Sequence, residues 1–116
     1  MMVPTGSFRI FLAAQPVDFR KGIDGLAAHV ANHFDLDPYC GAIFVFRSRS
    51  AGKIKVLVWD GTGMVLVMKR LAEGRFTWPK IQEMPVSLSR VQFDALFEGS
   101  DWTRIDTVRT HRPAFL

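Results

Sequence analysis

The chain has 116 residues and a formal net charge of +4; 48% of its positions are hydrophobic and 22% are charged. This length suits a single domain around one hydrophobic core, and the composition is that of a folded soluble protein. Both exclude a disordered segment, a collagen-like repeat and a solenoid array, and they weigh against an enzyme with its own cofactor domain.

Residues 8–14 are mostly apolar and predict a short strand, which Pro16 ends because proline lacks a backbone N–H. Apolar residues then recur at helical spacing from Phe19 to Val30. They predict a helix that begins after Asp18 as its N-cap and ends near Phe34. Two glycines in its first turns indicate either a later start or close backbone packing.

Three β-rich runs follow, at residues 41–47, 53–59 and 64–71, and short glycine-containing links join them. This pattern is typical of an antiparallel meander. Ser89 with Gln92 forms a capping-box pattern, and Gly99 fits the C-terminal end of a second helix. We expect an α+β fold of order β-α-β-β-β-α, with an antiparallel sheet of about four strands and two helices mainly on one face. Residues 1–103 would form the domain, and 104–116 a mobile or partner-dependent tail.

Helices gathered on one face would leave the other face of the sheet open. The apolar side chains expected there would form a patch too large to stay in water on a monomer. They are a candidate protein interface: Phe44, Phe46, Leu57 and Trp59. The alternative is that the C-terminal tail folds back over this face.

Motifs for enzymatic chemistry are missing. Neither a P-loop nor a dinucleotide-binding glycine motif occurs, and residues 60–63 read as a hairpin turn. His29 and His33 have the spacing of two metal ligands but lack the accompanying glutamate of a zinc protease. The acidic residues that metal-dependent strand transfer would need are explained as a cap, an ion pair and a turn: Asp18, Asp24 and Asp60. We therefore expect no catalytic residue, no metal, no cofactor and no enzymatic activity.

Basic residues are the remaining signal, since the isoelectric point is near 9.7 and ten of the 15 basic residues are arginine. Arginine suits bidentate contacts with phosphate. Phe76 and Trp78 alternate with charges, as in a stacking platform for bases. The alternative is a solvated turn whose charges protect a sheet edge. The candidate nucleic-acid-binding residues are Arg20, Lys21, Arg47, Arg49, Lys53, Lys55 and Arg75.

Cys40 is the only cysteine, so no internal disulfide can form, and a reducing cytoplasm is the expected location. Its small neighbours predict a buried position for it. No apolar run approaches the ~20 residues of a membrane span, so we expect no membrane association.

Several segments, in this order along the chain, resemble one family: the small accessory protein that the second open reading frame of IS66-group insertion sequences encodes, often called TnpB. The segments are residues 16–26, 37–47, 53–63, 69–71, 74–79 and 92–102, the last with Glu98-Gly99-Ser100-Asp101-Trp102 as its marker. Together they cover about three quarters of the chain, which makes the match specific.

The resemblance implies a role in bacterial transposition beside a separately encoded transposase, which carries the catalytic acidic residues. The expected partners are this transposase and DNA of the mobile element, and the expected open apolar face of the sheet favours a second copy of the chain or another protein. Two functions stay open: a non-catalytic factor that binds DNA or assembles the transposase complex, and a protein-interaction module that docks the transposase without touching DNA.

Overall fold

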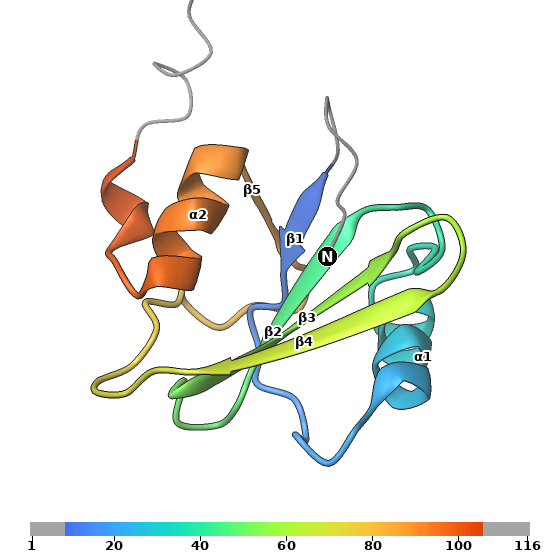
Figure 1. Cartoon of the computed structure of the whole chain (residues 1–116), viewed down its shortest axis with the longest axis horizontal. Helices are drawn as coiled ribbons and strands as arrows, with labels where there is room; N and C mark the ends of the chain where they lie inside the picture. The colour runs from blue at the N-terminus through green and yellow to red at the C-terminus, as the bar shows by residue number, and fades with distance from the viewer. Residues whose placement is uncertain (1–8, 106–116) are drawn as a thin grey trace, which may run out of the picture.

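The computed structural model describes residues 9–105, and Figure 1 shows the arrangement of their helices and strands. In chain order the elements are β1 (Ile10–Leu12), α1 (Ile23–His33), β2 (Ile43–Arg47), β3 (Lys53–Trp59), β4 (Met64–Arg70), β5 (Val86–Leu88), α2 (Arg90–Glu98) and a 3-10 helix, η1 (Trp102–Arg104). The expected tail lies outside these residues, apart from Arg104 and Ile105.

The strands form one five-stranded sheet in the order β4-β3-β2-β1-β5. β2, β3 and β4 make the predicted antiparallel meander, whereas β1 runs parallel to β2. The parallel pair arises because α1 carries the chain across from β1 to β2, as in a βαβ unit. The sheet is therefore mixed and has one strand more than expected, since β5 pairs antiparallel with β1. Sequence reasoning missed β5 because three residues are too few to show a period.

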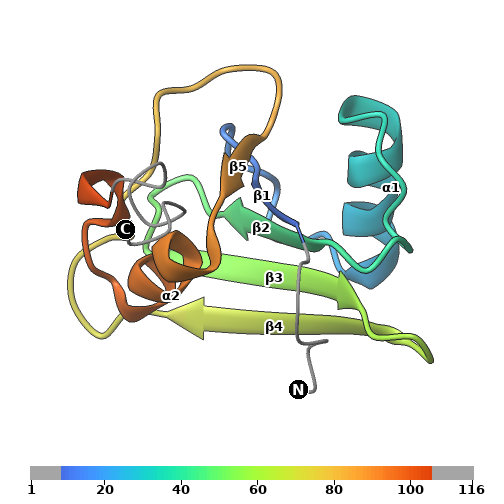
Figure 2. The same ribbon diagram turned by 90° about the horizontal axis from the view of Figure 1, so that it is seen from above.

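The helices lie on opposite faces of the sheet, so the expectation that both cover mainly one face is wrong. α1 packs Leu26 and Val30 into a core cluster with Phe44, on one side of β2. α2 packs Leu96 into a second cluster with Val45, on the other side. Neighbouring residues of a strand point to opposite faces, so β2 is buried on both. Figures 1 and 2 show the strands between the two helices.

Helix α1 begins later than the sequence pattern predicted. The N-cap is Gly22, with φ −98° and no side-chain cap hydrogen bond. Asp18 instead closes a turn, in which its carboxylate accepts a hydrogen bond from the backbone N–H of Arg20 at 2.9 Å. A Cβ atom on Gly25 would lie 3.1 Å from Cβ of Lys21. Gly22 therefore marks the later start of the helix, and Gly25 allows the close approach of the Lys21 side chain.

Helix α2 has both predicted ends. The Ser89 hydroxyl accepts from the backbone N–H of Gln92 at 3.1 Å, and the Gln92 side chain accepts from the Ser89 N–H at 3.0 Å. Gly99 ends the helix with φ 88°, and the Ser100 N–H reaches back to the Ala95 carbonyl at 2.9 Å. The predicted capping box and C-terminal glycine are confirmed.

The Cys40 side chain is exposed, so the prediction that it is a buried filler is wrong. Within residues 9–105, no helix has the length and apolar character needed to cross a membrane.

Candidate nucleic-acid interface

The turn between β2 and β3 is held by its own hydrogen bonds. The Ser48 N–H donates to the Lys53 carbonyl at 3.0 Å, and the Lys53 N–H donates to the Ser48 hydroxyl at 3.2 Å. The chain after β4 is tied to the same turn, because Phe76 donates to the Ala51 carbonyl at 2.8 Å. This contact brings Arg75, which precedes Phe76, beside the hairpin.

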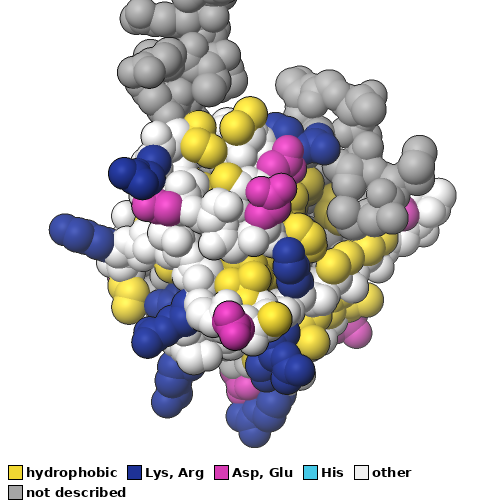
Figure 3. Space-filling model, turned by 60° about the vertical axis from the view of Figure 1, so that its left-hand side comes forward, with side chains coloured by type: hydrophobic (Ala, Val, Ile, Leu, Met, Phe, Trp, Pro, Cys, Tyr) yellow, Lys and Arg dark blue, Asp and Glu magenta, His cyan; other side chains and the backbone are white. Residues whose placement is uncertain are grey.

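Exposed cations gather at this end of the sheet. Lys53, at the start of β3, lies directly opposite Arg70, at the end of β4. Arg49 and Arg20 line one surface hollow of about 430 Å³. Figure 3 shows Lys and Arg side chains gathered along the lower side of the molecule, where the β2–β3 turn lies. We call this set the basic end; it consists of Arg20, Arg49, Lys53, Arg70 and Arg75, all exposed.

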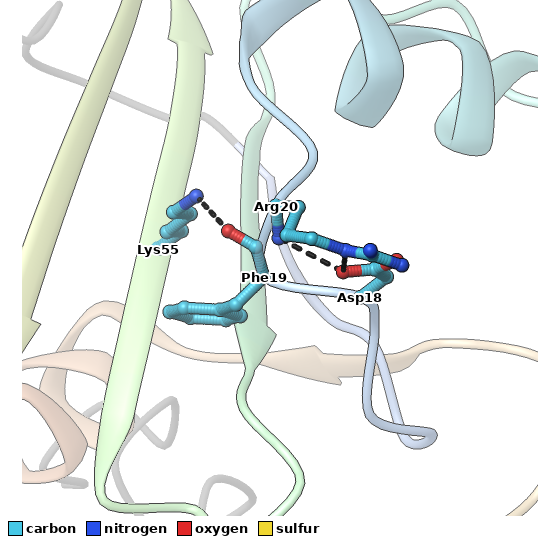
Figure 4. A network of polar contacts seen from close by, with 4 residues as sticks. All are labelled: Asp18, Phe19, Arg20 and Lys55. Atoms are coloured by element: carbon cyan, nitrogen blue, oxygen red, sulfur yellow. Dashed lines mark hydrogen bonds and ion pairs between the residues drawn. The ribbon is translucent and has the colours of Figure 1, made fainter.

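Lys55, also predicted to bind nucleic acid, is bonded within the protein. Its ammonium donates to the carbonyls of Phe19 and Lys21 at 2.8 and 2.9 Å. The same Nζ lies 4.8 Å from the centre of the Phe19 ring, a cation–π contact. Figure 4 shows Lys55 reaching from β3 to the chain between Asp18 and Arg20. Lys55 therefore positions the loop that carries Arg20, and Lys21 in that loop is half-buried.

Arg47 has a comparable internal role. Its guanidinium donates to the Arg49 carbonyl at 2.9 Å and lies 6.0 Å from the centre of the Trp78 ring. Its Nε is buried without a hydrogen-bond partner, and burial lowers the pKa of this group. Arg47 thus shapes the turn that presents Arg49.

Arg20 is exposed but already paired. Its guanidinium contacts the Asp18 carboxylate at 2.7 Å, and these hydrogen bonds hold the pKa of Asp18 well below its usual range (Figure 4). A phosphate at Arg20 would have to compete with Asp18. Arg49, Lys53, Arg70 and Arg75 have no such carboxylate partner among the described residues.

The residues predicted to form a protein interface are mostly core. Phe44, Phe46 and Leu57 are at most 1% exposed and lie in the cluster beneath α1. Trp59 is half-buried, with its ring edge-on to Tyr39 at a centroid distance of 5.5 Å. Phe44, Phe46 and Leu57 are packed with α1 and do not form the open apolar face that the prediction required.

The aromatic residues after β4 do not form a stacking platform. Phe76 is buried in the α2-side core cluster. The Trp78 indole N–H donates to the Ala13 carbonyl at 2.8 Å, which fixes this ring against the protein.

Arg70 belongs to the basic end, although the predicted set of binding residues omitted it. The pairing of β3 with β4 could have indicated this residue. If Asp60 faces Gly63 across the turn, counting back along both strands places Lys53 opposite Arg70. That count requires knowing which turn residues pair, and the sequence leaves this open.

His29, His33 and Asp60 have structural roles. His29 and His33 stack face to face, 4.2 Å between ring centres, so they do not converge on a common point. Burial, with the nearby charges of His33 and Lys21, lowers the pKa of His29 to about 4. Asp60 accepts backbone hydrogen bonds from Thr62 and Gly63 at 2.9 Å each, as the predicted turn requires. Residues 9–105 contain no cluster of side chains able to hold a metal ion.

The fold and the site define a small α+β protein with exposed cations at one end of its sheet. Residues 8–107 match the family described as IS66 Orf2 like protein, and the chain belongs to this family, an accessory open reading frame of IS66-type insertion sequences.

Two relatives from Sinorhizobium fredii are similar over most of their length. "Uncharacterized protein y4jC" is 42% identical over 113 residues, which cover 97% of each chain. "Uncharacterized protein y4hO" is 39% identical over 102 residues, 87% of this chain and 89% of the relative. No solved structure matches the chain significantly.

Proposed function

We propose that the protein is a non-catalytic accessory factor for transposition and that its basic end binds DNA of the mobile element. The observation that carries this proposal is the set of exposed cations with no carboxylate partner among the described residues: Arg49, Lys53, Arg70 and Arg75. They come from the β2–β3 turn, two adjacent strand ends and the loop after β4, so one surface presents them together.

Phosphate recognition fits this arrangement. Arginine guanidinium groups contact phosphate oxygens bidentately, and lysine acts as a point charge. Such contacts position a protein on a nucleic acid without reading its sequence. The proposed role is therefore to hold element DNA for a separately encoded transposase, which carries the chemistry.

Salt dependence tests the proposal. If the four unpaired cations each neutralise one phosphate, the logarithm of affinity should fall with the logarithm of salt concentration at a slope of about −3.6. The measurement is fluorescence anisotropy of a labelled duplex from the element end, over a series of salt concentrations.

Two variants sharpen this test. Replacing Arg49 and Lys53 together by Gln should reduce the slope by about 1.8. Arg90→Gln, which removes an exposed cation that is not part of the basic end and is paired with Asp94 at 3.3 Å, is the control and should leave the slope unchanged. Absence of binding at low salt, or an equal effect of both variants, would contradict the proposal.

The alternative function is docking of the transposase without DNA contact. The surface first predicted for this docking is not accessible, because Phe44, Phe46 and Leu57 are buried. Co-purification with the transposase that survives both nuclease treatment and Arg49→Glu would favour this alternative over DNA binding.

A further inference from the structure

Strand β4 is an open edge of the sheet. It is the outermost strand beside β3, and no described strand lies beyond it. Figures 1 and 2 show β4 running along the outer side of the sheet. At seven residues, Met64–Arg70, it is as long as any strand in the protein's described part. An exposed edge of this length is a template for another strand.

The hydrogen bonds to β3 determine which backbone groups of β4 point outward. Asp60 donates to the Gly63 carbonyl at 3.0 Å, and Leu71 donates to the Gly52 carbonyl at 3.1 Å, so hydrogen-bonded pairs flank both ends of the ladder. Such pairs alternate along an antiparallel ladder. Val65, Val67 and Lys69 therefore bond to β3, and the outward-facing residues are Met64, Leu66, Met68 and Arg70.

Both sides of this edge are apolar. On the α1 side, Leu66 is half-buried and Met68 is 57% exposed. On the α2 side, Val67 lines a mainly apolar hollow of about 380 Å³ together with Phe93 and Phe97, and the exposed Asp94 and Glu98 lie at this hollow as well. Residues 64–68 contain neither a charge nor a proline, the usual features that prevent strands from pairing at an edge.

We propose that β4 pairs antiparallel with β4 of a second copy of this chain, about a two-fold axis at Val67. In this register each outward-facing residue meets another one: Met64 meets the second copy's Arg70, and Leu66 meets the second copy's Met68. The full strand is used, so no outward-facing backbone group of β4 stays unpaired.

Charge favours a second copy in this orientation. The strand carries charges only near one end, at Lys69 and Arg70. Antiparallel pairing about Val67 places Lys69 opposite the second copy's Val65, away from its Lys69. Parallel pairing would align the two basic ends, and like charges directly opposite one another destabilise a sheet.

Packing agrees with this register. The exposed Met68 side chain is covered by the second copy's Leu66, and the two Val67 side chains meet beside the apolar hollow. The two basic ends point in opposite directions along the extended sheet, and Arg70 is the basic-end residue that lies in the seam, opposite the second copy's Met64. Arg20, Arg49 and Arg75 lie outside β4, and Lys53 lies on β3, so dimerisation does not require the proposed DNA binding.

Sedimentation equilibrium of the full chain over a range of protein concentrations tests the dimer. The wild type should show twice the 13.1 kDa chain mass. Met68→Lys should weaken the dimer at least tenfold, because it places a charge on the apolar edge. Met84→Lys is the matched control, since Met84 is 53% exposed and lies outside β4; it should have no effect. A monomeric wild type, or equal effects of both variants, would overturn the proposal.

Disulfide crosslinking tests the register directly, in a Cys40→Ser background so that each variant has one cysteine. Val67→Cys should form a dimer-linking disulfide, since paired Cα atoms at a non-hydrogen-bonded position lie about 4.5 Å apart. Val65→Cys should not, because the two copies of residue 65 are offset by about 14 Å along the strands. Crosslinking at 65 but not at 67 would overturn the register, and circular dichroism checks that both variants fold.

Discussion

Lys55 uses its charge within the protein, unlike the lysine two residues before it. Its ammonium reaches two backbone carbonyls that lie 36 and 34 residues away in the sequence. Lys53, on the same side of β3, stays exposed. Both lysines appear equivalent in the sequence because strand period alone places them on one face. The difference depends on the loop that packs beside β3.

Lys55→Met should destabilise the fold. It leaves the Phe19 and Lys21 carbonyls without their charged donor. A hydrogen bond to a charged group contributes about 1.5–3 kcal/mol to stability. We expect a loss on the order of 2 kcal/mol in the free energy of unfolding, measured by urea denaturation. Lys53→Met is the control, and its effect should stay below about 0.5 kcal/mol. Equal losses would mean that Lys55 does not anchor the loop.

His29 should make stability depend on pH. Its pKa falls from 6.5 to about 4 in the folded protein, because burial and the neighbouring charges of His33 and Lys21 disfavour the imidazolium. The unfolded chain therefore binds more protons than the folded chain between these values. The His29 imidazole therefore does not reduce the free energy of unfolding above about pH 6.5. The free energy of unfolding should decrease progressively as the pH falls from about 6.5 toward about 4.

Urea denaturation at pH 7.5, 6 and 5 measures this dependence. His29→Leu should flatten it, since the half-buried imidazole contacts Phe34 and Phe46 edge-on and its buried Nδ1 has no hydrogen-bond partner. His33→Gln should retain most of the dependence, because burial is the largest cause of the shift. A wild-type curve that is flat from pH 7.5 to 5 would contradict the assignment.

At the scale of elements, α2 depends on its ends. It has nine residues, fewer than an isolated helix needs to be stable in water. The Lys69 ammonium also lies 4.4 Å from the Phe97 ring and donates to the Phe97 carbonyl in the last turn. A cation at that position is favourable for a helix dipole.

Ser89→Ala should lower the free energy of unfolding by about 1 kcal/mol, because it leaves the Gln92 N–H without its side-chain acceptor. Thermal unfolding followed by circular dichroism measures the loss. Ser87→Ala, at an exposed position in β5, is the control and should change the stability little. If the two variants were equally stable, the capping box would not stabilise α2.

At the scale of the molecule, one sheet supports two separate cores. Phe44 and Phe46 point into the core beneath α1, while Ile43 and Val45 point into the core beneath α2. This arrangement explains why β2 and β3 lack the alternation of a half-exposed sheet. It also explains why apolar residues assigned to a docking surface are structural.

Phe46→Ala should therefore reduce stability by about 3–5 kcal/mol, the usual cost of removing a fully buried aromatic side chain. Urea denaturation measures it. Ile81→Ala, at a position 65% exposed, should have little effect. If Phe46 belonged to an exposed docking surface, its replacement would leave the free energy of unfolding nearly unchanged.

Local signals in the sequence determined much of this protein. The meander of β2, β3 and β4, both ends of α2 and the turn at Asp60 follow from turn residues, capping patterns and apolar runs, which act over a few positions. The family likewise follows from motifs along the chain. These features can be predicted without knowing which other segments of the chain pack against them.

Only the tertiary structure decided the rest. Whether α1 and α2 share a face depends on the handedness of the connection from β1 to β2, and β5 forms because β1 offers it an edge. The division of the cations into anchors, such as Lys55, and exposed groups, such as Lys53, depends on contacts between distant segments. Physically, these outcomes arise from packing between parts of the chain that no local period or motif connects.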